Sequence, residues 1–135
     1  MKKITVGDVF MVDFARAGNA QRGYRPAVVI SNNKGNLYSP DVIVIPITTA
    51  KKKIHQPTHV QLDAIENGLV KDSMALCENP VTVPKTVLRR YCTHLSDDAI
   101  QKIAVAHLAS TSALAYLDME SMQAALELSL RLKTA

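Results

Sequence analysis

The feature of this sequence that most constrains its fold is a change of pattern at Ser96. Before this residue, short β-prone runs alternate with turn-forming residues. From Ser96 to Ala135 the sequence contains no Gly or Pro, and apolar residues recur at helical spacing. Short strands with tight connections are typical of a small barrel or a strongly curled sheet. The sequence therefore predicts a mainly β protein with C-terminal helices.

The β-prone part divides into six expected strands. They cover residues 9–14, 26–31, 42–49, 59–62, 73–78 and 89–93. The Asn and Gly residues at positions 32–36 favour a tight turn. Pro46 has no N–H for a ladder hydrogen bond, so it predicts a bulge or an edge within the third strand. Short helical turns are expected at residues 64–68 and directly after Pro84.

The helical part is too long to form one helix on a domain of this size. An unbroken helix from Ser96 to the C-terminus would extend roughly 55 Å at about 1.5 Å per residue. Ser96 can cap a first helix, whose shared face carries Ile100, Ile103, Ala104, His107 and Leu108. We expect a break at residues 118–121, where Asp118 and Ser121 can each cap a second helix. The apolar positions of that helix would be Met122, Ala125, Leu126, Leu128 and Leu130.

Length and composition indicate one domain with its own core. A chain of 135 residues with 47% hydrophobic content can bury a core without disulfides or a structural metal. Its net charge of +4 and pI of 9.2 are compatible with a phosphate-rich partner. Cys77 and Cys92 form no CxxC motif, so we expect buried free thiols and a reducing compartment.

The sequence gives no sign of secretion, of a membrane span or of a metal site. Residues 1–8 contain two lysines but no apolar stretch of signal-peptide length. No run of about eighteen uninterrupted apolar residues occurs, and no His, Cys, Asp and Glu spacing indicates a metal site. We therefore expect a soluble cytoplasmic protein that needs no cofactor.

A positive side chain stands where a loop becomes a strand. Gly18 and Gly23 permit backbone conformations that other residues avoid, and Pro26 holds Tyr24 and Arg25 extended. Arg25 is thereby presented at the junction, and its planar cationic fork suits two phosphate oxygens. An ordinary hairpin loop with a solvated arginine explains the same residues, so this segment alone leaves both interpretations open.

Three motifs in a fixed order carry a family resemblance. They are Gly7-Asp8-Val9-Phe10-Met11-Val12-Asp13-Phe14, then Gly18-x-x-Gln21-x-Gly23-x-Arg25-Pro26-Ala27-Val28-Val29-Ile30, then Val44-Ile45-Pro46-Ile47-Thr48. Pro57-Thr58-His59-Val60 and Asp72-Ser73 extend the match. Over about residues 4–118, the chain resembles the MazF/PemK toxin endoribonucleases, particularly those of Gram-positive bacteria.

This resemblance implies an SH3-like barrel of the CcdB/MazF type and a toxin of a type II toxin-antitoxin system. Such toxins form homodimers and cleave single-stranded mRNA at short sequences without a metal, and an antitoxin blocks them. The neighbouring 2′-hydroxyl attacks, leaving 2′,3′-cyclic phosphate and 5′-hydroxyl ends. The toxin domain would span residues 1–118, and residues 119–135 would be a helical extension packed on the same domain or on the dimer.

Arg25 and Thr48 are the catalytic residues that the resemblance implies. Arg25 would stabilise transition-state charge, and Thr48 would donate a hydroxyl hydrogen bond to the same phosphate, although strand threonines are commonly packing residues. Ala20 stands where family members carry an acidic residue, so the proton acceptor is missing. His59 and His55 are the candidates for proton transfer, although an ordinary strand or surface histidine is the commoner case.

Two loops and one strand end would bind the RNA. The expected contacts are Asn19, Gln21, Arg22, Tyr24, Lys51, Lys52, Glu78 and Asn79. Glu78 and Asn79 stand where family members often present a base-reading polar residue. Aromatic residues make up 4% of the chain and Trp is missing, so readout should depend more on amides and backbone than on stacking. His94 and His107 are expected to be structural.

A non-catalytic barrel is the alternative: either a CcdB-like poison that binds DNA gyrase, or an inactive nucleic-acid-binding relative. Ala20 favours this alternative, because alanine can neither accept a proton nor orient a partner. Arg25 together with Thr48 favours the enzyme, because a gyrase poison has no evident need for a phosphate-directed arginine at this junction.

Overall fold

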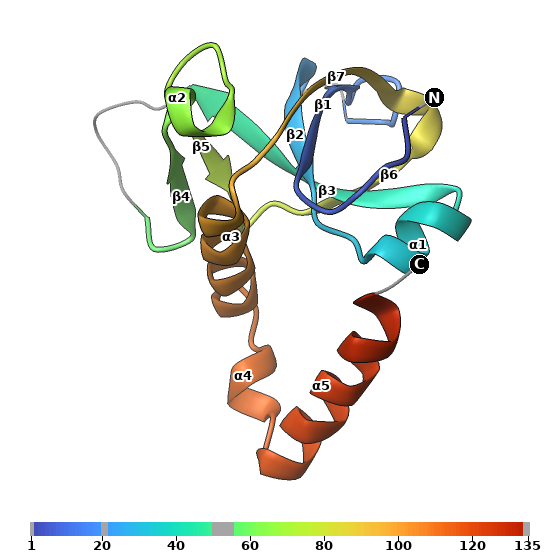
Figure 1. Cartoon of the computed structure of the whole chain (residues 1–135), viewed down its shortest axis with the longest axis vertical. Coiled ribbons are helices and arrows are strands. Elements are labelled where there is room, and N and C mark those ends of the chain that lie inside the picture. Colours follow the sequence, from blue (N-terminus) through green and yellow to red (C-terminus); the bar gives the residue numbers. More distant parts are fainter. Residues whose placement is uncertain (1, 20–21, 50–55, 134–135) are drawn as a thin grey trace.

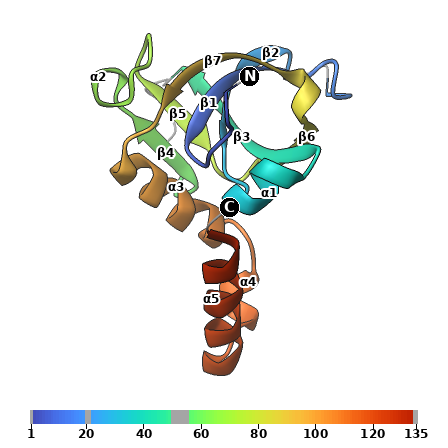
Figure 2. The ribbon, with the colours of Figure 1, turned by 45° about the vertical axis from the view of Figure 1, so that its right-hand side comes forward.

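Seven strands curl into a barrel-like sheet, and α3 packs across one side of it (Figures 1 and 2). The computed structural model describes residues 2–19, 22–49 and 56–133. The strands are β1 (Asp8–Asp13), β2 (Tyr24–Val29), β3 (Asp41–Thr49), β4 (His59–Leu62), β5 (Ser73–Leu76), β6 (Val81–Pro84) and β7 (Leu88–His94). The helices are α1 (Asn33–Tyr38), α2 (Ala64–Asn67), α3 (Asp97–Ala109), α4 (Ala113–Tyr116) and α5 (Met119–Lys133), with a 3-10 turn η1 (Lys85–Val87) before β7. The expected mainly β fold with C-terminal helices is confirmed.

The sheet is antiparallel and open. Its strand order is β4-β5-β3-β2-β1-β7, and β6 pairs with β3 beside this path. Among the described residues, β4 and β7 each pair on one side alone, so the sheet curls as in a small barrel without closing. Figure 2 looks into the ring that β1, β3, β6 and β7 form. The expected SH3-like barrel is therefore present in an open form.

Strand β3 lies in the middle of the sheet and changes partners along its length. Residues 41–44 pair with β6 and residues 44–46 with β2, whereas residues 47–49 pair with β5. Pro46 stands at this change, where a residue without an N–H disturbs the ladders least. The expected bulge or edge at Pro46 is wrong, because the residue is buried in a central strand that passes from one ladder to the next.

Apolar side chains form two core clusters on opposite faces of the sheet. The cluster beneath α3 consists of Val9, Val28, Ile45, Ile47, Val60, Leu62, Ala75, Cys77, Leu95, Ala99, Ile103 and Ala106. The cluster inside the curled sheet consists of Ile4, Phe10, Val12, Phe14, Ala27, Val29, Val42, Val44, Val83, Val87 and Leu88. Because successive residues of β2 and β3 enter different clusters, these strands read as continuous apolar runs.

Three local predictions differ from the structure. The side chain of Asn32 accepts a hydrogen bond from Gly35 N (2.7 Å) and caps α1, so a helix replaces the expected tight turn. Strand β6 was not predicted, because it has only four residues and ends in a proline, so its sequence lacks a recognisable strand pattern. The helical region breaks at Ser110 as well as at Asp118, because the Ser110 and Thr111 hydroxyls donate hydrogen bonds to carbonyls of the last turn of α3.

The predicted start of α5 is confirmed. Asp118 caps this helix by accepting a hydrogen bond from Ser121 N at 2.7 Å.

The expected shared face of α3 is confirmed, since Ile100, Ile103, Ala104, His107 and Leu108 all line one apolar cavity. Ile103 is buried and Ile100 packs against the core, but Ala104 and Leu108 are exposed. The buried positions besides Ile103 are Ala99 and Ala106. The helix therefore lies on the sheet along a stripe rotated slightly from the one that the sequence indicates.

The two cysteines are free thiols in different surroundings. Cys77 is buried, and this burial, with the charge of the adjacent Glu78, raises the pKa of its thiol to about 12. Cys92 is half-buried. The expectation of two buried thiols is therefore confirmed for Cys77 alone.

A buried carboxylate at the start of β1 ties the N-terminus to β7. Asp8 accepts hydrogen bonds from Lys2 Nζ (2.9 Å), from Thr5 N (2.9 Å) and from His94 Nδ1 (2.8 Å). Burial by itself would raise the pKa of Asp8, but the hydrogen bonds from His94, Thr5 and Lys2 outweigh it and leave the pKa below its usual 3.8. His94 is therefore structural, as expected.

We expect Asp8→Asn to lower the free energy of unfolding by about 2–4 kcal/mol, because it removes the buried charged acceptor of three hydrogen bonds. Asp41→Asn, at an exposed position, is the matched control and should change the unfolding free energy by less than about 0.5 kcal/mol. The folded-state pKa of Asp8 is lowered, so its contribution is complete above pH 3.8 and declines as the pH falls further. Urea denaturation at neutral pH and near pH 3 measures both effects. Equal unfolding energies for the two variants at neutral pH would contradict this role.

Candidate active site

The loop between β1 and β2 places Arg25 at the first paired rows of a hairpin. Arg25 stands opposite Val12, and the loop closes where Phe14 N donates to Gly23 O (2.9 Å). Gly23 has a φ of 61°, a conformation that other residues adopt only with strain. Arg25 Nε donates to Arg22 O at 2.7 Å. Its two terminal nitrogens have no protein partner among the described residues, so they are available to a ligand.

The register of β2 and β3 relates Arg25 to Thr48. The last paired row is Ala27 with Pro46. Extending this register by two residues along each strand would set Arg25 opposite Thr48, although β2 and β3 are no longer paired there. Both residues also lie on the same face, because side chains alternate along a strand and opposite residues share a face. At this point β3 has left β2 and pairs with β5, so the row is open.

Thr48 lies on the face of the sheet that points away from α3. In the ladder through β5, Thr48 pairs with Met74 and Met74 with Gln61. His59 stands two rows further along the same ladder, opposite Leu76. The opposite face of these strands belongs to the core beneath α3. Thr48 and His59 therefore share one face across three strands.

The structure joins two predicted site residues that lie far apart in the sequence. His59 Nε2 lies 2.8 Å from Glu78 Oε2, and the His59 side chain is 10% exposed. Within the described residues, the remaining ring nitrogen of His59 and the second carboxylate oxygen of Glu78 are buried without a hydrogen-bond partner. A carboxylate that holds one imidazole nitrogen fixes the ring and its tautomer. One oxygen of Glu78 is thus already committed to His59.

The other expected RNA contacts divide into described and undescribed positions. Tyr24 is 58% exposed, and Asn19 and Arg22 are half-buried in the β1–β2 loop. Asn79 follows β5 in a turn closed by its own N–H to Leu76 O (2.9 Å). Ala20, Gln21, Lys51, Lys52 and His55 lie outside the described residues. The roles assigned to these residues stay predictions.

A cavity of about 320 Å³ lies on the opposite face of the same strand ends and was not expected from the sequence. Pro26 and Thr49, the neighbours of the two candidate catalytic residues, line it together with Lys71 and Arg90. Both cations are exposed, and neither forms an ion pair within the described part of the chain. The sequence signal was the Arg89-Arg90 pair in the last strand. Positive charge therefore flanks the end of β2 on both faces.

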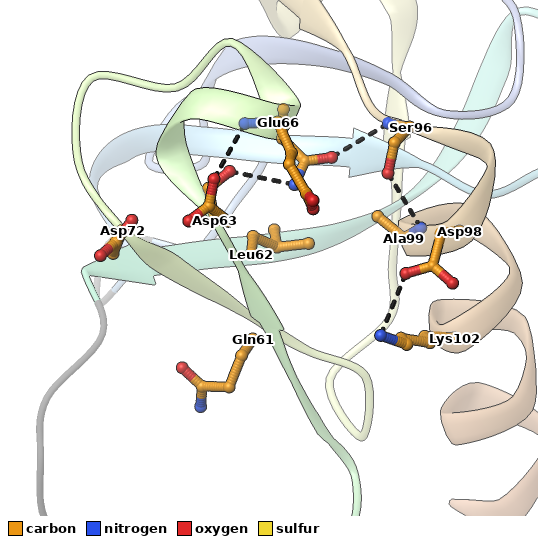
Figure 3. A pocket seen from close by; sticks show the side chains of 10 residues that line it. Gln61, Leu62, Asp63, Glu66, Asp72, Ser96, Asp98, Ala99 and Lys102 are labelled. Carbon is orange, nitrogen blue, oxygen red and sulfur yellow. Dashed lines mark hydrogen bonds and ion pairs between the residues drawn. The ribbon is translucent and has the colours of Figure 1, made fainter.

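A second cavity, of about 390 Å³, lies between α2 and the start of α3 (Figure 3). Its polar groups serve the fold: Asp63 caps α2, Ser96 caps α3, and Asp98 pairs with Lys102 at 3.0 Å. With Glu66 and Asp72 also in its wall, this cavity is acidic and would repel phosphate.

In the described residues, no group of three or more His, Cys, Asp or Glu is arranged to hold a metal ion. In the same residues, no helix is both long and apolar enough to cross a bilayer.

A family model and a curated relative both place this chain in the same family. The family of PemK-like, MazF-like toxins of type II toxin-antitoxin systems matches residues 5–109. Endoribonuclease EndoA of Bacillus subtilis is 41% identical over 98 residues, which are 72% of this chain and 84% of EndoA.

Solved structures share the fold. MazF (Form-I) of Deinococcus radiodurans has a TM-score of 0.67 at 17% identity, covering 87% of this chain and 100% of that one. A mycobacterial endoribonuclease in complex with its cognate antitoxin has a TM-score of 0.65 at 23% identity, covering 85% of this chain and 98% of that one. Helices α4 and α5 lie beyond the residues that the family matches.

Proposed function

Because the chain belongs to the family of PemK-like, MazF-like toxins of type II toxin-antitoxin systems, we propose that it is an endoribonuclease whose chemistry centres on Arg25 and Thr48. The observation that carries this proposal is the open row of β2 and β3, in which register and strand alternation bring these two residues to one face. The similarity to EndoA supports the same activity. The substrate is single-stranded mRNA, because a base must leave its stack to be read.

The proposed reaction uses the RNA's own nucleophile. The 2′-hydroxyl oxygen attacks the adjacent phosphorus, the bond from phosphorus to the 5′-oxygen breaks, and the products are a 2′,3′-cyclic phosphate and a 5′-hydroxyl. One proton leaves the 2′-hydroxyl and one reaches the 5′-oxygen. The terminal nitrogens of Arg25 bind two phosphate oxygens and stabilise the added negative charge. Thr48 donates its hydroxyl to the same phosphate. This route needs no cofactor.

His59, held by Glu78, is the proposed proton acceptor. Its second ring nitrogen lacks a partner within the described residues, which supports a role toward substrate. Arg25 cannot serve as the base, because a guanidinium stays protonated in proteins. Position 20 carries alanine, so the loop supplies no carboxylate there. His55 is the second candidate for this step.

The remaining predicted contacts form the proposed RNA-binding surface. Asn19, Gln21, Arg22 and Tyr24 come from the β1–β2 loop, Lys51 and Lys52 follow β3, and Glu78 and Asn79 follow β5. Lys51, Lys52 and Arg22 supply the backbone-tracking positive charge that single-strand binding requires. The amides supply contacts to base edges.

We also assign the protein three properties by relation to its family. A mycobacterial relative is solved with its cognate antitoxin, which supports a cognate antitoxin as the inhibitor of this toxin. The active form is a homodimer. Because mRNA is the substrate, the site of action is the cytoplasm.

We expect Arg25→Ala and Thr48→Val each to lower the rate of RNA cleavage by about a hundredfold or more, because each removes a donor to the transition-state phosphate. Arg16→Ala, in the same loop, and Thr49→Val, on the opposite face of the strand, are matched controls and should retain activity. The assay follows a long RNA in EDTA and tests the fragments for cyclic phosphate ends. Intact RNA at high protein excess would favour a non-catalytic or gyrase-binding barrel, and equal cutting by all variants would indicate a contaminating nuclease.

We expect His59→Gln to remove the acidic limb of the pH–rate profile together with most of the activity, because a base must be neutral to accept a proton. Glu78→Gln should weaken activity less, since the imidazole remains but loses its charged partner. His107→Gln serves as the histidine control. The measurement is kcat/KM from pH 5 to 9, and an unchanged acidic limb in His59→Gln would exclude this residue as the base.

A further inference from the structure

Helix α5 has no buried residue, although eight of its fifteen residues are apolar. Six large apolar side chains are between 38% and 83% exposed: Met119, Met122, Leu126, Leu128, Leu130 and Leu132. The chain leaves the domain through α4, and α5 then runs back so that its C-terminal end approaches α1 (Figure 1). The toxin domain of this chain does not bury it.

A partner must therefore cover α5. An isolated helix of 15 residues is marginal in water, and contiguous exposed apolar surface of this kind usually marks an interaction site. The helix lies outside residues 5–109, so the domain shared with the family does not account for it.

The charges on α5 indicate what that partner is. Glu120 and Glu127 lie in its N-terminal and middle turns, and Arg131 and Lys133 lie in its last turn. A second copy of the helix packed antiparallel sets acidic turns against basic turns, whereas a parallel copy sets like charges together. No ion pair within the described residues uses any of these four side chains.

We propose that α5 is a self-association helix, packing antiparallel against α5 of a second copy of this chain with Glu120 facing Arg131 of the second copy, twice by symmetry. Glu120 and Arg131 are eleven residues apart, about three turns, so they lie on the same side of the helix. The two are roughly 16 Å apart along the axis at 1.5 Å per residue, too far to pair within one chain. Only a second chain joins them.

The charged stripe also selects the contact face. At about 100° per residue, Leu128 falls roughly 60° from Arg131 and 80° from Glu120, whereas Leu126 falls more than about 100° from both. The contact face is therefore the one that carries Leu128 and Leu132, together with the small side chains of Ala124 and Ala125, which let two backbones approach closely. Leu126 lies on the other side.

A charge exchange tests the pairing in the full-length protein. Glu120→Arg and Arg131→Glu should each weaken self-association about fivefold to tenfold, measured by sedimentation equilibrium, because each acts twice in the symmetric pair. The double variant should return to near the native value. Both substitutions oppose the helix dipole, so an effect within one chain would instead make the double variant the weakest, and that outcome overturns the proposal.

A second pair of variants tests the face. Leu128→Asp should weaken self-association at least tenfold, whereas Leu126→Asp, with an equal exposed fraction in the single chain, should change it less than threefold. Circular dichroism checks that α5 stays helical. Equal effects at the two positions contradict the assigned face. If Leu128→Asp leaves self-association unchanged and weakens binding of the antitoxin, α5 serves that protein and the proposal is wrong. These readouts do not depend on RNA cleavage.

Discussion

The structure depends on the fact that one strand, β3, is shared between two hydrogen-bond ladders. Its first residues complete the curled sheet with β2 and β6, and its last residues carry β5 and β4. Pro46 marks the change, since it has no N–H to give to either neighbour. As a result the ladder between β2 and β3 ends at Ala27 and Pro46, while Arg25 still pairs with Val12 of β1. The open row is thus a consequence of how the barrel is built.

Positive and negative side chains lie on separate surfaces around this open row. Arg25, Lys71 and Arg90 lie around the end of β2, on one face or the other, and none of them forms an ion pair within the described chain. The carboxylates near α2 and the start of α3 form a separate acidic surface. The protein carries a net charge of only +4, so this separation of charge, more than the overall charge, shapes its electrostatic field. The buried carboxylate of Asp8 takes no part, because its lone pairs are already occupied by the fold.

Sequence pattern predicted those parts of the fold that local chemistry decides. Alternation and turn residues located six of the seven strands, and Ser96 and Asp118 marked helix starts because their side chains cap them. Strand β6 could not be predicted from the sequence, because its four residues form a strand only through pairing with β3. In the candidate site, Arg25 and Thr48 followed from a motif whose spacing reflects register. The contact of His59 with Glu78 did not, because nineteen residues and a strand pairing separate them.

The C-terminal extension poses a physical problem that the domain does not solve. An exposed apolar helix associates with whatever apolar surface it meets, and a head-to-tail contact of that kind grows into open assemblies. A charge gradient along α5 changes this outcome. Antiparallel pairing of identical helices satisfies both ends of the gradient at once and leaves no end to extend, so assembly at this helix stops at two chains. The acidic start and basic end of α5 therefore act as a limit on association as well as an attraction.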